Sequence, residues 1–155
     1  MRRLTRRYII NSLDGLNLSE PIRYERYYID DNLRIQKKDN IYQKEKLDND
    51  NNIIAKIDIS ENEFLKLKEK SYSEIIRDSY VLLNNNNISI KKYLGKYKGL
   101  FRVEVKFDSI DDMNNYNKET WMGEEITNSP LAFDKYLSKL SDSDFHNELK
   151  KYIKL

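Results

Sequence analysis

Apolar and polar residues alternate along most of this chain, and a period of two is typical of β-strands that bury one face. The clearest example is the segment 100–107. Val103 and Val105 fall on one face there, and Arg102 and Glu104 fall on the other. A helix would mix these two sets of residues, so the pattern predicts a chain built mainly of strands.

The same alternation recurs in short segments that are separated by turns. Asn and Asp tolerate the left-handed backbone of tight turns, so the runs at 48–52 and 84–87 are expected at hairpin tips, and the pair 39–40 forms a further turn. The predicted strands cover residues 3–10, 23–29, 32–38, 41–47, 53–59, 75–83, 88–94 and 100–107.

Helical signals are few and gather towards the end of the chain. Ser60 with Glu63 has the spacing of a capping box and opens a short helix. Serines that can cap a helix predict further helices over 109–117 and 129–140, and an amphipathic pattern predicts a closing helix over about 142–155. We therefore expect an α+β fold, an antiparallel β-barrel or strongly curved sheet with a few flanking helices, mainly C-terminal, in a single domain over residues 1–155.

The composition excludes several classes of protein. The chain has no cysteine, so it has no disulfide framework or thiolate metal site. Charged residues make up 35% of it, the mean hydropathy is −0.85, and no apolar run approaches the roughly 20 residues of a membrane span. A cytoplasmic protein without a membrane partner is expected. The net charge of +2 is too small to predict binding to duplex nucleic acid.

Several strings, taken in order, resemble the CYTH superfamily, which includes class IV adenylate cyclases, thiamine triphosphatases and inorganic triphosphatases. The strand FRVEVKF at 101–107, followed by WMGEEIT at 121–127, is similar to the family's strand of alternating glutamates and its W-x-G-x-E-V-T segment. The string LRIQ at 33–36 resembles the family's R-x-R strand, and KEK at 44–46 resembles its T-x-K strand. The resemblance covers roughly residues 3–140.

The resemblance implies a tunnel of antiparallel strands. In such a tunnel, basic side chains hold a triphosphate and glutamates hold one or two divalent metal ions. The chain departs from the family at the acids, because Arg3, Thr5 and Arg7 stand where the first strand should read E-x-E-x-K. Glu104 matches a family glutamate, but its partner is replaced by Lys106. Most of the metal-binding acids are therefore predicted to be lost.

Residues two apart on a strand face the same way, so the remaining charged residues can be assigned to the tunnel wall. The residues expected to bind ligand phosphates are Arg3, Arg7, Arg34, Lys44, Lys46, Lys56, Arg77, Lys91, Arg102 and Lys106. The polar or acidic residues expected in the tunnel are Thr5, Gln36, Ser79, Ser89 and Glu104. So many cations in one cavity need an anion. We therefore expect metal-free binding of a phosphate-rich ligand, without efficient hydrolysis and without assigned catalytic residues.

Three alternatives remain at this point. The ligand could be a nucleotide or a polyphosphate, and capture of a nucleotide signal of antiviral defence would suit a phage or mobile element. A second reading is a metal-dependent triphosphatase or cyclase that uses Mg²⁺ or Mn²⁺ with Asp58, Glu104, Glu124 and Glu125. A third reading is a protein-interaction scaffold whose basic residues lie on a solvated outer face. The sequence leaves the oligomeric state open.

Overall fold

In residues 4–153, which the computed structural model describes, eight strands form one antiparallel sheet. Their order in the sheet is β1-β8-β7-β6-β2-β3-β4-β5. The strands are β1 (Thr5–Ile10), β2 (Ile22–Asp30), β3 (Leu33–Lys38), β4 (Ile41–Leu47), β5 (Ile53–Asp58), β6 (Ser73–Leu82), β7 (Asn85–Leu94) and β8 (Phe101–Lys106). The expected strand-rich α+β fold is confirmed.

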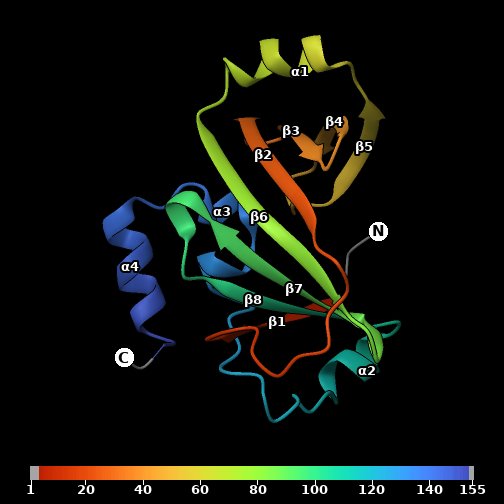
Figure 1. Ribbon diagram of the computed structural model, residues 1–155, viewed down its shortest axis with the longest axis vertical. Helices are drawn as coiled ribbons and strands as arrows, with labels where there is room; N and C mark the ends of the chain where they lie inside the picture. Colours follow the sequence, from red (N-terminus) through yellow and green to blue (C-terminus); the bar gives the residue numbers. More distant parts are fainter. Residues whose placement is uncertain (1–3, 154–155) are drawn as a thin grey trace.

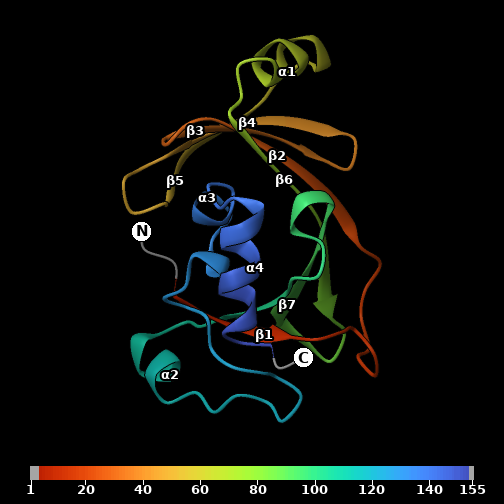
Figure 2. The same ribbon diagram turned by 90° about the vertical axis from the view of Figure 1, so that its left-hand side faces the viewer.

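The sheet curves so strongly that its two ends face each other. Strands β3, β4 and β5 form one wall, β7, β8 and β1 form the opposite wall, and the long strands β2 and β6 join them (Figures 1 and 2). Among the described residues no strand pairing joins β1 to β5, so the sheet is open along that seam. The concave face encloses a space that the C-terminal segments enter.

The convex face is covered by small apolar clusters. Helix α1 (Glu61–Lys68) begins at Ser60, whose hydroxyl accepts a hydrogen bond from the Glu63 N–H, as the capping-box spacing predicts. Its buried residue, Phe64, packs with Tyr27 and Ile35 of β2 and β3. A second cluster lies on the outer faces of β1, β7 and β8, where the chain that follows helix α2 (Ile110–Asn114) packs through Tyr116, Trp121 and Met122.

The C-terminal segments fill the concave side. They are the 3₁₀ turn η2 (Pro130–Ala132), helix α3 (Asp134–Leu137) and helix α4 (Asp142–Lys150). Figures 1 and 2 show α3 between the two walls of the sheet and α4 beside them, at one end of the enclosed space. Leu131, Leu137 and Phe145 are fully buried there against the central core. None of the helices in the described part of the chain has the length and apolar character needed to cross a membrane.

Three predicted helices are shorter or more broken than their sequence patterns suggested. The helix expected over 109–117 ends at Asn114, and the closing helix expected over 142–155 ends at Lys150. The helix expected over 129–140 is divided, because Phe133 has an extended backbone (φ −130°, ψ 133°) between η2 and α3. This break turns the residue after Phe133 towards the concave face.

The outer edge of β1 is covered by the segment around Gly123. The Gly123 N–H donates to the Ile9 carbonyl (2.8 Å), and the Ile9 N–H donates to the Glu124 carbonyl (3.0 Å). A Cβ atom built on Gly123 would lie 2.4 Å from the Ile9 carbonyl oxygen, which belongs to the backbone and cannot swing away. Only glycine therefore allows this close approach.

Gly123→Ala is expected to lower the free energy of unfolding by about 1–3 kcal/mol, because the segment must move away from β1. Urea unfolding at neutral pH measures the change. Gly15→Ala is the comparison, since open space surrounds Gly15 and only its positive φ of 80° opposes a side chain, at about 1 kcal/mol. A Gly123→Ala protein as stable as wild type would contradict the packing described for this edge.

Candidate phosphate-binding cavity

Basic side chains line a cavity of about 400 Å³ on the concave side of the sheet. Seven strands and the α3 region contribute to its wall. Within residues 4–153 its lining holds nine cations and two carboxylates, Glu104 and Asp134. The nine cations, here called the basic cluster, are Arg7, Arg26, Arg34, Lys38, Lys56, Arg77, Lys91, Arg102 and Lys106.

Strand alternation and register bring these side chains to one face. Arg7 on β1 pairs across the strands with Glu104 on β8, and their charged atoms lie 3.6 Å apart. Lys91 on β7 lies directly across from Arg102 on β8 in the strand register. The residues between them along each strand point to the convex clusters, so the charges and the apolar side chains separate onto opposite faces.

Most of the predicted residues meet in this cavity. Seven of the ten predicted phosphate-binding cations line it, namely Arg7, Arg34, Lys56, Arg77, Lys91, Arg102 and Lys106, and so do Gln36 and Glu104 from the polar set. The other polar residues support the basic cluster: the hydroxyls of Thr5, Ser79 and Ser89 accept hydrogen bonds from Arg7, Arg77 and Lys91. Arg3 lies outside the described residues.

The placement expected for Lys44 and Lys46 is wrong. In β4 it is Glu45 that faces inwards, where it is fully buried and pairs with Arg34 (2.9 Å) and Lys56 (3.3 Å). Its two lysine neighbours therefore point to the convex side. Lys44 forms an ion pair with Glu63 of α1 there, and Lys46 is exposed.

Asp134 is the centre of the cavity's charge network, and the sequence did not predict it. Its carboxylate lies 2.9 Å from Arg26, 3.0 Å from Arg77 and 3.4 Å from Arg102. The Tyr93 hydroxyl donates a further hydrogen bond to it at 2.5 Å. One carboxylate thus connects guanidinium groups from β2, β6 and β8.

Arg26 and Lys38 are two further cavity residues absent from the predicted set. The signal for both lies in the alternation of β2 and β3. Arg26 shares a face with Tyr24, whose ring lies beneath the Arg77 guanidinium at 4.5 Å, and Lys38 shares a face with Arg34. Extending the same-face rule to every strand would have found them.

The network shifts the pKa values of its members in opposite directions. Burial alone would raise the pKa of Asp134, but Arg77, Arg102 and Arg26 outweigh it and hold that pKa well below the usual range. Burial, with repulsion from Arg34 and Arg77, lowers the pKa of Arg26 to about 10. Burial and the neighbouring arginines also lower the pKa of the Lys91 ammonium well below its usual range, although Glu104 opposes them. Positive charge is therefore in excess around Lys91.

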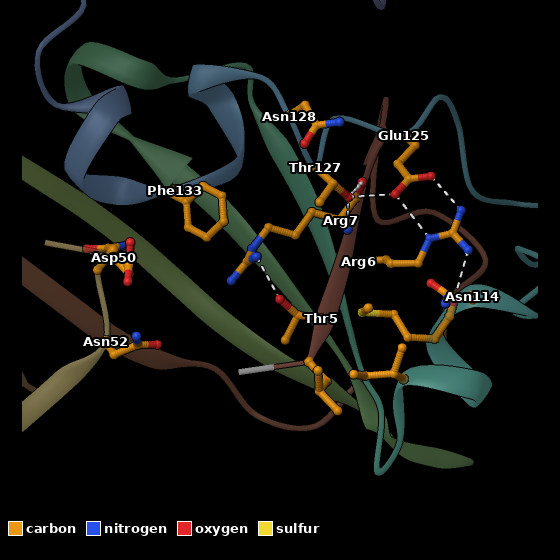
Figure 3. Close-up of a pocket in the computed structure, with 14 residues that line it drawn as sticks. Thr5, Arg6, Arg7, Asp50, Asn52, Asn114, Glu125, Thr127, Asn128 and Phe133 are labelled. Atoms are coloured by element: carbon orange, nitrogen blue, oxygen red, sulfur yellow. Dashed lines mark hydrogen bonds and ion pairs between the residues drawn. The ribbon is translucent and has the colours of Figure 1, made fainter. Parts of the chain in front are cut away.

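A second space of about 830 Å³ adjoins the basic cavity. Arg7 and Phe133 line both spaces, and the Arg7 guanidinium lies over the Phe133 ring at 4.2 Å. Figure 3 shows Arg7 reaching from β1 towards Thr5, with the Arg6–Glu125 ion pair on the other side of the strand. The basic cavity thus opens towards a larger and less charged space.

The acids of the enzymatic alternative do not gather at one place. Asp58 is exposed on β5 and accepts a hydrogen bond from Gln43, Glu124 is exposed, and Glu125 is held by Arg6. Glu104 alone of the four lines the basic cavity. In residues 4–153 no group of three or more His, Asp or Glu side chains is placed to hold a metal ion.

The architecture is known from solved proteins. The structure of the inorganic triphosphatase NE1496 superposes with a TM-score of 0.73 at 19% identity, over 91% of this chain and 97% of that one. The chain has the triphosphate-tunnel fold. A second structure, of the hypothetical protein NE1496, gives a TM-score of 0.71 at 19% identity, over 88% of this chain and 97% of that one. No protein-family model and no curated protein matches the sequence.

Asp134→Asn is expected to lower the free energy of unfolding at pH 7 by about 3–5 kcal/mol, because three guanidinium groups lose their common counter-ion. Asp78→Asn is the control, since Asp78 pairs with a half-exposed Arg23 outside the cavity, and a loss of about 0.5 kcal/mol is expected. Equal losses in the two variants would contradict the central role of Asp134.

The free energies of unfolding of wild type and Asp134→Asn are expected to depend differently on pH. Because the pKa of Asp134 is lowered on folding, its stabilisation is complete above the unfolded value of about 3.9 and is lost as the pH falls through the folded value. The stability difference between wild type and Asp134→Asn should therefore be constant from pH 7 to 5 and should shrink below about pH 4. Urea unfolding across this range measures it. A difference that grows on acidification would show that the carboxylate is not held ionised.

Proposed function

We propose that this protein binds a phosphate-rich anion, a nucleotide or a polyphosphate, in the basic cavity and holds it through its own side chains. The observation that carries the proposal is the imbalance of charge within the described residues: nine cations line the cavity, against the two lining carboxylates and the buried Glu45, which pairs with Arg34 and Lys56. Phosphate groups are the natural partners of such a lining, because guanidinium groups bind two phosphate oxygens at once and ammonium groups bind as point charges.

Electrostatics explains why a multiply charged guest is favoured. Two like charges about 4 Å apart, at an effective dielectric near 20, repel by about 4 kcal/mol. Asp134 relieves this repulsion for Arg26, Arg77 and Arg102, but one negative charge is shared among three positive ones. A polyphosphate would supply the missing negative charge, and its binding would release the remaining repulsion.

The cavity's own carboxylates favour holding the ligand over hydrolysing it. A divalent metal ion needs several oxygen ligands, whereas Glu104 lies beside Arg7 and Asp134 is bonded to three arginines. This donor set does not fit Mg²⁺ or Mn²⁺. Sequestration without efficient hydrolysis follows as part of the proposal, and capture of a signalling nucleotide of antiviral defence is its narrowest form. The adjoining space beside Arg7 offers room for a nucleoside.

Binding is expected to stabilise the protein in the presence of EDTA. Tripolyphosphate at 100 times its dissociation constant should add about 2.7 kcal/mol to the free energy of unfolding. A thermal-shift panel of tripolyphosphate with linear and cyclic nucleotides measures this, and the shift should fall steeply with added salt. If none of these anions stabilises the protein at low salt, the proposed function is wrong.

A second candidate is a metal-dependent triphosphatase, which the similarity to inorganic triphosphatase NE1496 favours. This alternative predicts release of orthophosphate from tripolyphosphate or ATP with Mg²⁺ or Mn²⁺, and loss of that activity in Glu104→Gln. We expect no turnover above the background of the Glu104→Gln protein. Turnover that requires both the metal ion and Glu104 would replace the binding proposal with the enzymatic one.

A further inference from the structure

Not all cations of the basic cavity are equally available to a ligand. Arg26 and Arg77 are held by Asp134, at 2.9 and 3.0 Å. Asp134 itself is fixed, because the flanking residues Leu131 and Leu137 are completely buried in the core. A carboxylate anchored in this way cannot withdraw, so it repels any phosphate group that approaches the same two guanidinium groups.

Neutralisation is weaker on β7 and β8, where Asp134 reaches only Arg102, at 3.4 Å. Lys91 and Arg102 are direct cross-strand partners, and like charges in this position destabilise a sheet. The Lys91 ammonium donates a hydrogen bond to the Ser89 hydroxyl (3.2 Å), but among residues 4–153 no carboxylate forms an ion pair with it. Arg102 contacts Asp134 through Nη1, while its buried Nε has no hydrogen-bond partner in the described part of the chain. A buried donor without an acceptor beside an unneutralised ammonium marks a position for an anion.

We infer that one phosphate group of the ligand binds between Lys91 and Arg102. Arg26 and Arg77 stabilise the fold through Asp134 and do not contact the ligand. This inference rests on the proposed function, and it assigns the position of the phosphate within that site. It divides the basic cavity into a side on β2 and β6, where Asp134 is the counter-ion, and an anion-binding side on β7 and β8. The excess positive charge around Lys91 agrees with this division.

The division predicts that Lys91→Met and Arg26→Met differ in their loss of affinity and change the melting temperature in opposite directions. Lys91→Met should weaken tripolyphosphate binding at least tenfold more than Arg26→Met does. Both variants remove one positive charge from the cavity, so they share the long-range loss of attraction, and the difference between them reports direct contact. The ranking of thermal stability should be reversed. Lys91→Met should raise the melting temperature by removing a charge from an environment that disfavours it, whereas Arg26→Met should lower it by weakening the Asp134 network.

Isothermal titration calorimetry with tripolyphosphate in EDTA measures the affinities at one salt concentration. Lys38→Met is a matched control that does not touch Asp134, because Lys38 lines the cavity from β3 and lies over the Tyr24 ring. It should weaken binding by no more than Arg26→Met does, and it keeps the comparison available if Arg26→Met fails to fold.

The outcomes separate the two proposals. If wild type binds tripolyphosphate and Lys91→Met loses no more affinity than the control variants, the inference is overturned while the proposed function stands. If wild type itself does not bind, the proposed function fails and the inference fails with it. A loss of affinity at least tenfold larger in Lys91→Met than in the control variants supports both.

Discussion

The structure depends on a concentration of positive charge that the fold creates and only partly neutralises. Strand register brings nine basic side chains to one cavity, and the carboxylate of Asp134 connects three of them from its position on α3. Without that carboxylate, Arg26, Arg77 and Arg102 would repel one another on the concave side of β2, β6 and β8. With it, the three strands share one counter-ion and the cavity still carries an excess of positive charge. Stability and the proposed preference for an anionic ligand therefore have the same electrostatic origin.

Much of this arrangement follows from alternation alone. A period of two separates Arg102 and Glu104 from Val103 and Val105, and the structure places the first pair in the cavity and the second in the convex cluster. The Asn- and Asp-rich turns at 39–40 and 48–52 are also where the sequence places them, whereas the β6–β7 turn lies at 83–84 and β7 already begins at Asn85. Asp48, for example, accepts hydrogen bonds from the Asn52 and Asp50 N–H groups at the β4–β5 tip. These features are local, and local sequence determines them.

Alternation cannot say which of two polar faces is the inner one, and this explains the error at β4. Lys44 and Lys46 share one face and Gln43 and Glu45 share the other, so both faces carry polar residues and burial gives no signal. Contacts with other elements determine which face of β4 is the inner one. Glu63 of α1, on the convex side, forms an ion pair with Lys44, and Arg34 forms one with Glu45 on the concave side. Asp134 was missed for a related reason, since its role depends on the break at Phe133 and on partners 32 to 108 residues away in sequence.

A crystal structure of the protein grown with tripolyphosphate in EDTA tests the central claim most directly. The account predicts phosphate density inside the cavity, within hydrogen-bond distance of its ammonium and guanidinium groups, with Asp134 still bonded to Arg26 and Arg77. Tripolyphosphate bound only on the outer surface, with the cavity side chains unchanged around water, would contradict it.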